Sequence, residues 1–338
     1  MSRKAHNPQK EASKNLGIPL ALELGVDLEL RRLLDSCGLL GDFITSFAKR
    51  VKLELQRVRD GDQTNVPLLP FFVHSEIPYR ELKMLFTGVL PLYSFLRVIQ
   101  LHHCAIGDNG ILVIVEFIRG YRPPADKNPF GIQCVEFPGC QIGPVGAKHI
   151  STLLTENESI GRCILDFNPL GDAGVKVIAS AVRWNGTLEE LSLQHCGIES
   201  PGAEAIAEGV LSCSNVRSLS LRGNALGPEG IKHVGAALSV SSRIEVLDVA
   251  DTRFGHSYEA VEALCHGVDA GGALTSIDMD FNTLTPDAVP LVAALPVKNK
   301  RIVELRVNER MDANYYSIIQ NALEQNGKGR KKKKYARA

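Results

Sequence analysis

The sequence lacks the features that mark secreted proteins, membrane proteins and metal-framework proteins. No apolar run reaches the roughly 18 residues that a membrane-spanning helix needs, and residues 1–16 are polar, without the apolar core of a signal peptide. None of the eight cysteines forms a CxxC pair, which argues against a zinc or disulfide framework. We therefore expect a cytoplasmic protein with reduced cysteines and no membrane contact, whose Asn-x-Ser/Thr matches at Asn157 and Asn185 arise by chance.

The motifs of several large enzyme classes are absent as well. The sequence has no P-loop, no dinucleotide-binding fingerprint and no nucleophile elbow. We therefore expect no enzymatic activity, no cofactor, no metal and no small-molecule substrate.

What the chain does contain is an internal repeat with the template L-x-x-L-x-L-x-x-[N/C]-x-L. Successive copies of its Asn/Cys position lie 36, 28, 28, 28, 28, 30 and 28 residues apart, and the step of 36 holds an insertion around 119–130. Leu68, Phe71 and Val73 fit a degenerate first copy, which makes about nine repeats. The Asn/Cys position falls at Cys104, Cys140, Asn168, Cys196, Asn224, Thr252, Asn282 and, in a weaker last copy, Arg310.

The second half of each repeat is typical of a helix. Gly, Ser or Thr followed by Pro or Asp opens it, as in Gly143-Pro144 and Ser200-Pro201, and we expect the first residue of each pair to cap the helix. Apolar residues then recur at helical spacing. Each repeat is therefore predicted to be one short strand, a turn and one helix, stacked on its neighbours 28 residues away.

These repeats resemble the ribonuclease-inhibitor class of leucine-rich repeats, whose relatives include the GTPase-activating protein of Ran, the repeat domains of NOD-like receptors and axonemal proteins. The resemblance implies an α/β leucine-rich-repeat solenoid, or horseshoe, with a parallel sheet on the concave face and helices on the convex face. The predicted domains are a polar N-terminal segment (1–16), a helical N-terminal cap (17–66), the repeat array (67–323) and a basic C-terminal tail (324–338).

Residues between the template leucines are expected on the concave face, in three columns, because side chains alternate along a strand. The C-terminal third of this face is rich in acidic residues, interrupted by Arg306 and Arg310. We predict that it docks a basic peptide or protein; ordinary solvated charge, or the chain's own tail lying there, are alternatives. The predicted site residues are Asp248, Asp251, Asp278, Asp280, Glu304 and Glu309.

Two clusters look like metal ligands, His102-His103-Cys104 and His195-Cys196. Both cysteines occupy the inward Asn/Cys position, so their neighbours should point elsewhere, and a structural role is favoured. An open sheet face also offers little to perturb the pKa of a carboxylate for catalysis.

The tail combines seven basic residues with no acidic one, so the other 327 residues sum to a charge of −7. It lacks apolar periodicity, and we expect it to be disordered alone. It could contact an acidic protein surface such as tubulin tails, bind nucleic acid or direct nuclear import. Its basic residues are Lys328, Arg330, Lys331, Lys332, Lys333, Lys334 and Arg337.

The function that these patterns favour is a non-enzymatic scaffold or adaptor in a multi-protein intracellular assembly. The resemblance makes a ciliary, axonemal or cytoskeletal setting one interpretation. Regulation of a small GTPase is an alternative, although no local motif identifies a catalytic arginine here. A nuclear or ribonucleoprotein factor that uses the basic tail is another.

Overall fold

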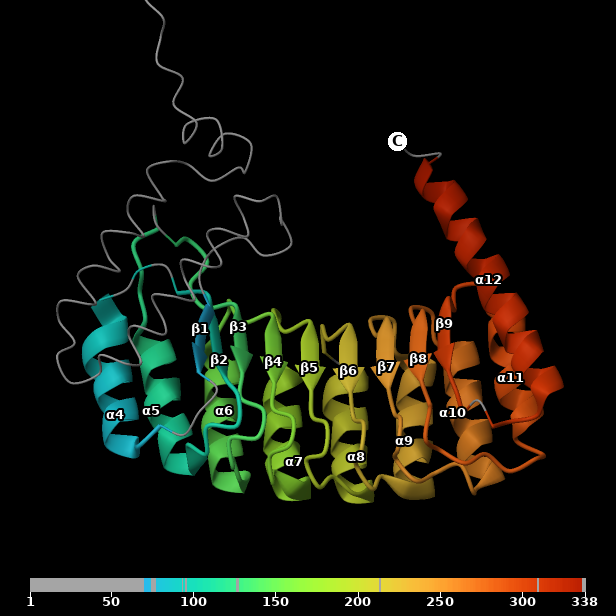
Figure 1. Ribbon diagram of the computed structural model, residues 1–338, viewed down its shortest axis with the longest axis horizontal. Coiled ribbons are helices and arrows are strands. Elements are labelled where there is room, and N and C mark those ends of the chain that lie inside the picture. The colour runs from blue at the N-terminus through green and yellow to red at the C-terminus, as the bar shows by residue number, and fades with distance from the viewer. Residues whose placement is uncertain are drawn as a thin grey trace, which may run out of the picture. The chain divides into compact units, whose positions relative to one another are not determined.

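The computed structural model describes residues 70–73, 77–92, 94, 96–125, 128–212, 214–308 and 310–335, with the side chains of all these except 70–73, 89, 92 and 329–335. The chain divides into two compact units, Met1–Phe137 and Pro138–Ala338. Strands and helices alternate along each of them (Figure 1). The predicted N-terminal segment (1–16) and helical cap (17–66) lie outside the described residues.

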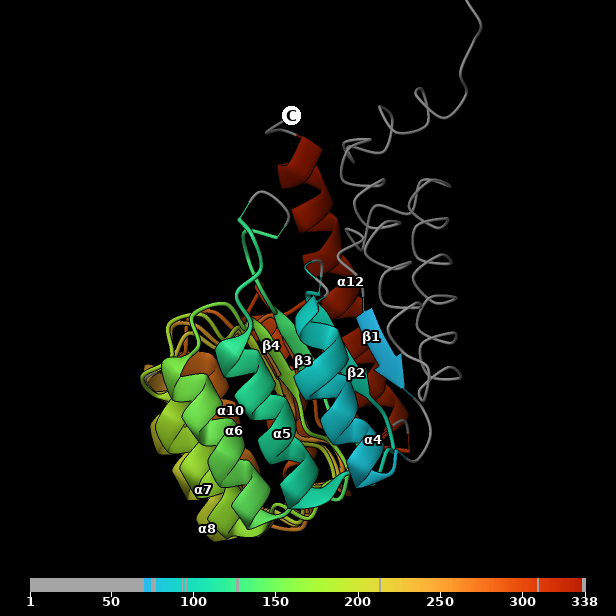
Figure 2. The same ribbon diagram turned by 90° about the vertical axis from the view of Figure 1, so that its left-hand side faces the viewer.

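The first unit holds the first three strands. These pair in parallel and in chain order, with Phe71 opposite Ile99 and Ile99 opposite Val135, which confirms the degenerate first repeat. Helices α4 and α5 lie side by side and cover one face of the strands (Figure 2). The elements are β1 (Pro70–Val73), α4 (Tyr79–Met84), the π-helix η1 (Leu85–Val89), the 3-10 helix η2 (Leu90–Leu92), β2 (Val98–Leu101), α5 (Gly107–Gly120) and β3 (Cys134–Glu136).

The insertion in the first unit packs back onto its own repeat. The hydroxyl of Tyr121 accepts a hydrogen bond from the backbone N–H of Leu96 at 3.0 Å. The side chain of Asn128 donates to the carbonyl of the same Leu96 at 2.9 Å, and the guanidinium of Arg97 lies 4.6 Å from the ring centre of Phe130. The extra residues therefore extend the repeat without breaking its strand register.

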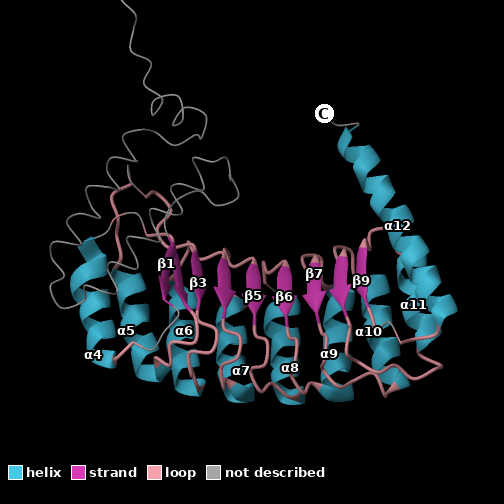
Figure 3. Ribbon diagram, viewed as in Figure 1, coloured by secondary structure: helices cyan, strands magenta, loops and turns pink. Residues whose placement is uncertain are grey.

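The second unit holds six parallel strands, also in chain order, with the helices on one side of the sheet (Figure 3). Its strands are β4 (Arg162–Ile164), β5 (Glu190–Ser192), β6 (Ser218–Ser220), β7 (Val246–Asp248), β8 (Ser276–Asp278) and β9 (Glu304–Arg306). Its helices are α6 (Pro144–Glu156), α7 (Gly171–Val182), α8 (Ser200–Ile206) continued by the π-helix η3 (Ala207–Leu211), α9 (Gly227–Val240), α10 (Tyr258–Ala270), α11 (Val289–Lys298) and α12 (Ala313–Tyr335).

The core of the second unit is the stack of template leucines. Leu191, Leu219 and Leu247 face one another in strict register on neighbouring strands, and the inward Leu193 and Leu221 are completely buried. Each repeat buries apolar area against both neighbours, and burial of one leucine side chain contributes roughly 2 kcal/mol. The predicted stacking at intervals of 28 residues is confirmed.

The consensus asparagine satisfies the backbone of the turn after each strand. The Oδ1 atom of Asn224 accepts from the N–H groups of Cys196 and Ile198, and its Nδ2 donates to the carbonyls of Leu193 and Leu221. Asn168 and Asn282 make equivalent bonds. One side chain thus links two repeats, and an alternative residue at this position would leave buried backbone groups without partners.

A second set of asparagines, which the sequence analysis did not identify, lies where the helix leads into the next strand. Asn185 is 7% exposed and donates from Nδ2 to the carbonyl of Leu154, while its Oδ1 accepts from the N–H groups of Thr187 and Leu188. Asn157 accepts from Ser159 and Ile160 in the same way. Both side chains thus hold the turn that precedes the next strand.

The capping of the helices differs in part from the prediction. Gly143 precedes Pro144 at the start of α6 as expected, and Ser257 caps α10 through its hydroxyl. The expected cap Ser200 is wrong: the N-cap of α8 is Glu199, whose side chain makes no capping bond. Asp172 of the preceding repeat accepts instead from the N–H groups of Glu199 and Gly202, at 2.8 and 3.0 Å.

The basic tail also differs from the prediction. We expected disorder, but α12 continues through Tyr335 as one helix of 23 residues. Its first half packs on α11 and buries Ile319 and Ala322 against the last repeat. Because this half is held by packing, it provides a formed end from which helical hydrogen bonding continues into the basic stretch. None of the described helices is both long and apolar enough to cross a bilayer.

Candidate functional site

The predicted acidic face maps onto β7, β8 and β9 of the second unit. Asp248 lies opposite Asp278, and Asp278 lies opposite Arg306. Glu304 is paired with Ser276, whose hydroxyl donates to its Oε2 at 3.0 Å. The structure therefore brings Asp248, Asp278 and Glu304 together as predicted, while Glu309 lies outside the described residues.

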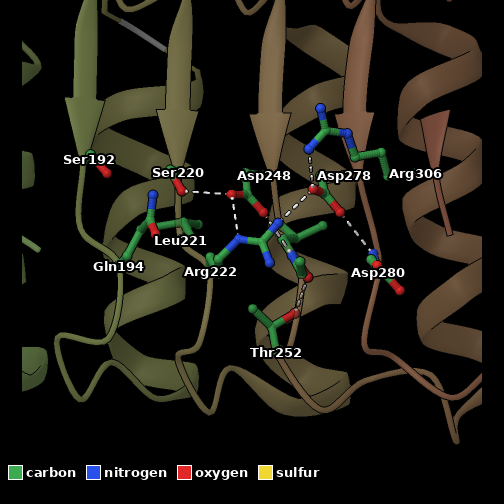
Figure 4. A network of polar contacts seen from close by, with 12 residues as sticks. Ser192, Gln194, Ser220, Leu221, Arg222, Asp248, Thr252, Asp278, Asp280 and Arg306 are labelled. Atoms are coloured by element: carbon green, nitrogen blue, oxygen red, sulfur yellow. Dashed lines mark hydrogen bonds and ion pairs between the residues drawn. The ribbon is translucent and has the colours of Figure 1, made fainter. Parts of the chain in front are cut away.

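An arginine that sequence reasoning gave no role lies at the centre of these carboxylates. Arg222 donates from Nε to Asp248 at 3.0 Å and from Nη2 to Asp278 at 2.6 Å, reaching across two strands (Figure 4). The hydroxyl of Ser220 donates to the same oxygen of Asp248 at 3.0 Å. On the far side, Arg306 lies 3.8 Å from Asp278 and 2.8 Å from Glu304.

This network determines which carboxylates of the acidic face are available to a partner. Burial raises the pKa of the Asp278 carboxyl above its ordinary value, and the charge of Asp248 adds to this effect, while Arg222 and Arg306 oppose it. Burial would by itself lower the pKa of Arg222, but the bond to Asp248 and the surrounding carboxylates raise it. Asp248 and Asp278 are thus largely paired with arginines of the same face. The attraction for a basic partner therefore comes mainly from the carboxylates that lie beyond the ends of the strands.

Two of the predicted acidic residues lie beyond the ends of the strands. Asp251 is exposed, and its backbone N–H donates to the carbonyl of Asp280 at 2.9 Å, which places these residues on neighbouring turns. Asp280 is half-buried and accepts from the N–H of Phe281 at 2.7 Å. The aromatic ring of Phe281, which is 67% exposed, therefore stands among carboxylates.

Phe281 is part of a feature that recurs in the repeats. The residue immediately before each Asn/Cys position has a positive φ between 50° and 70°, a left-handed conformation that favours glycine. We call the members in the second unit the strand-end row: Gly139, Phe167, His195, Gly223, Asp251 and Phe281. The repeat imposes the conformation at all of them, so a phenylalanine here is the costly choice.

Phe167 and His195 form the other prominent part of the row. Their rings stack with centroids 4.8 Å apart and planes 11° apart, and Phe167 is 53% exposed. Neither Phe167 nor Phe281 contributes to the buried core, so the fold does not explain why bulky aromatic rings occupy strained positions. Gly139 and Gly223 occupy the same template position, immediately before the Asn/Cys residue. This recurrence of glycine was the sequence signal that could have revealed the row.

The suspected ligand clusters are separated by the turns. The thiols of Cys104 and Cys196 point inward and donate to backbone carbonyls. In the first unit, His102 lies 3.3 Å from Glu136, and Gln100 donates to the same carboxylate at 2.9 Å. Among the described residues, no three His, Cys, Asp or Glu side chains are grouped as a metal site.

Three buried thiols of the second unit have little nucleophilic reactivity. Burial raises the pKa of Cys163, Cys196 and Cys265 to about 12, so these thiols carry essentially no thiolate at neutral pH. Cys163, Cys196 and Cys265 form no disulfide. They serve as small core residues.

The predicted tail site is described only in part. Lys328 is exposed and pairs with Glu324 one turn earlier on α12. Arg330, Lys331, Lys332, Lys333 and Lys334 lie on the same helix, and Arg337 lies outside the described residues. The basic residues therefore extend along a helix that is anchored on the second unit.

Comparisons with known proteins agree with this architecture. The leucine-rich-repeat family model matches residues 185–207 and 212–234. Pig ribonuclease inhibitor is 28% identical over 48% of this chain and 35% of its own length. Human NACHT, LRR and PYD domains-containing protein 13 is 27% identical over 45% of this chain and 15% of its own length.

The chain thus spans well under two thirds of these relatives. A solved complex of Rad7 and Elc1 from yeast covers 91% of the chain at 14% identity with a TM-score of 0.36, a likeness too low to carry a functional argument. The repeat spacing and the strand register give this chain a leucine-rich-repeat architecture, and its repeats are similar to those of ribonuclease inhibitor.

Proposed function

We propose that the sheet face and the strand-end row of the second unit bind another protein, without catalysis. The observation that carries this is the exposed ring of Phe281 on a left-handed backbone beside Asp251 and Asp280. The repeat imposes the left-handed backbone at this position, but nothing in the fold requires a bulky aromatic residue there, and such strained residues concentrate at functional sites. Large rigid aromatic side chains give the most binding energy per ordered residue at protein interfaces.

The partner that fits this surface carries lysine or arginine side chains. Arg222 and Arg306 pair with Asp248, Asp278 and Glu304. Asp251 and Asp280 of the same surface are not among these ion pairs and remain for a basic partner. A cation over the ring of Phe281 gains cation–π energy of about 1 kcal/mol, and the neighbouring Asp251 adds its charge. Electrostatic attraction would mainly raise the rate of association.

The comparisons support a binding role of this kind. Ribonuclease inhibitor is named for its action on another protein, and this chain is similar to it in its repeats. An open sheet face with mutually paired side chains suits a protein surface better than a small substrate, which needs an enclosed pocket.

Affinity purification followed by quantitative mass spectrometry tests the proposal. The informative variant combines Phe281→Ala with Asp251→Lys, because reversal of Asp248 would also break its bond to Arg222. A matched control combines Trp184→Ala with Glu208→Lys. Both residues are exposed, and they lie in the turn after α7 and on η3 rather than on the sheet face. We expect proteins with basic segments to be lost with the first variant alone, by about tenfold or more. Equal recovery with both variants would contradict the assignment of this surface.

The broader setting that we propose is a scaffold in a multi-protein assembly, with the basic residues of α12 contacting a second, acidic partner. A ciliary, axonemal or cytoskeletal location rests on the family resemblance alone. Microscopy of a tagged full-length chain, compared with one that ends before Lys328, would check both the location and the part that the tail plays in it.

A further inference from the structure

The last strand of the second unit interrupts a series of hydrogen bonds. In each repeat the backbone N–H at the second inward leucine position donates to the next strand, as Val249 does to Asp278 and Met279 to Arg306, both at 2.9 Å. The equivalent group in the last repeat is the N–H of Val307. It has no acceptor within the residues that the structure describes.

A carbonyl series ends at the same strand. The carbonyl of Glu245 accepts from the N–H groups of Thr275 and Ser276, and the carbonyl of Thr275 accepts from those of Val303 and Glu304. By this pattern the carbonyl of Val303 would accept two N–H groups of a following strand. It receives none from the described part of the chain.

A third unfilled position belongs to Asn326 of α12. Its Nδ2 donates to the carbonyls of Pro296 and Ile302, much as Asn185 bonds Leu154 in an earlier repeat. The Oδ1 atom of Asn185 accepts from the N–H groups of Thr187 and Leu188, just before the next strand. The Oδ1 atom of Asn326, by contrast, is buried without a hydrogen-bond partner, in a residue that is 5% exposed. The helix continues past Asn326, so its own chain does not supply those donors.

Helix α12 thus closes the core but leaves the hydrogen-bonding edge of β9 unpaired. Ile319 and Ala322 cover the last inward residues, and Leu305 and Val307 remain 4% and 6% exposed. The edge of a sheet with unpaired N–H and carbonyl groups is a template for one more strand. Addition of an extended segment is a known mode of peptide recognition, in which backbone bonds give affinity and flanking side chains give specificity.

The charges around this edge identify the chemistry of the segment. Residues 300–335, which include β9 and α12, hold ten lysines and arginines against four carboxylates. Glu304 pairs with Arg306 and Glu324 with Lys328, which leaves an excess of positive charge in this part of the chain. The edge therefore lies in a positive field, which favours a negatively charged partner.

We propose that an extended acidic segment of a partner protein adds to β9 as the next strand and lies along the basic part of α12. Its backbone takes up the free Val307 N–H and Val303 carbonyl, and its first N–H groups reach Asn326. Its negative charge complements the excess of lysine and arginine in this part of the sequence. This site is separate from the strand-end row, so either can fail without the other.

Fluorescence anisotropy of the full chain with a labelled peptide in which glutamate alternates with valine tests the proposal. The control peptide has the same sequence but is N-methylated at alternate residues, which removes backbone donors and keeps the charge. We expect binding that weakens at least about tenfold on N-methylation, together with slower hydrogen exchange of the Val307 amide. Absence of binding, equal affinity of both peptides or an unprotected Val307 amide would overturn it.

Protein variants separate the contribution of charge from that of the edge. Lys332→Gln, Lys333→Gln and Lys334→Gln together should weaken the peptide by about tenfold at low salt, because glutamine preserves helix propensity and removes charge. The matched change of exposed Lys83, Lys148 and Lys176 to Gln should leave affinity unaltered. A concentration-dependent dimer in sedimentation velocity that Val307→Pro abolishes would assign the edge to a second copy and overturn the proposed occupant.

Discussion

The imidazole of His195 lies between the ring of Phe167, on which it stacks, and the backbone of Gly223 in the next repeat. A Cβ atom at Gly223 would overlap the His195 ring, so the absence of a side chain at Gly223 is what makes room for it. Three successive members of the strand-end row therefore form one packed unit on the protein surface.

Replacement of Gly223 by alanine should disturb that unit. Gly223 has φ +70°, so alanine there carries left-handed strain, and its methyl group also expels His195 from the stack. We expect a loss of about 2 kcal/mol in the free energy of unfolding, measured by urea denaturation, and loss of the ring-current shift of the His195 protons in NMR spectra.

Gly227→Ala is the matched control for this prediction. Gly227 has φ +65° and nothing within 4 Å of the added Cβ, so only the strain remains and the loss should be about 1 kcal/mol. If the two variants are equally stable and both preserve the His195 shift, the packing of the imidazole against Gly223 is not as described.

The consensus asparagine of the sixth strand offers a second prediction. Asn224→Ala removes five hydrogen bonds, with the N–H groups of Cys196 and Ile198 and the carbonyls of three residues, Leu193, Leu221 and Arg222. We expect a loss of about 3 kcal/mol in the free energy of unfolding. Asn215→Ala, which removes one exposed bond to Gly186, should cost less than about 1 kcal/mol. Similar losses for the two would argue against the asparagine ladder.

Much of this fold could be predicted because one interval governs both the sequence and the structure. The spacing of 28 residues places Leu193 and Leu221 at equivalent positions of neighbouring repeats. The same interval separates Asn168 and Asn224 from Cys140 and Cys196, whose backbone N–H groups donate to them. Periodicity cannot tell which charges of neighbouring columns pair. The reach of Arg222 to Asp278, 56 residues away, depends on the rotamer of a long side chain that could equally point to solvent.

The two errors have local causes. Ser200 was predicted as a cap because a serine precedes proline, but Asp172 from the neighbouring repeat reaches the same N–H groups, and a contact across repeats is invisible to a local motif. The tail was predicted as disordered from composition alone. It continues a helix that is held on the second unit by Ile319 and Asn326, so tertiary packing outweighs the repulsion of its lysines.

The capping role of Asp172 leads to a third prediction. Asp172→Ala should cost about 1 kcal/mol in the free energy of unfolding, because two N–H groups at the start of α8 lose their acceptor. Asp172→Asn keeps an oxygen in the same place and should retain most of that stability. Urea denaturation of the three proteins distinguishes them. An alanine variant as stable as the wild type would show that Asp172 does not cap α8.

A fourth prediction concerns Asp166, whose carboxylate accepts from the Ser192 hydroxyl at 2.6 Å and the Gln194 N–H at 2.8 Å. Burial raises the pKa of this carboxyl above its ordinary value, and the charge of Asp248 adds to that, although the two hydrogen bonds and His195 partly offset it. Because the folded pKa exceeds the unfolded one, the stability that the protonated carboxyl provides is present at low pH and is lost as pH rises through the folded pKa.

Asp166→Asn should therefore be more stable than the wild type at pH 7, since the amide oxygen can accept both bonds without a buried charge. The advantage should shrink as the pH is lowered through the raised pKa of Asp166 toward the ordinary value of 3.8, where the wild-type carboxyl becomes neutral in the folded state as well. Urea denaturation of both proteins at a series of pH values measures this difference. An advantage that stays constant, or grows as the pH falls, would show that the Asp166 charge is stabilised by its neighbours rather than penalised by burial.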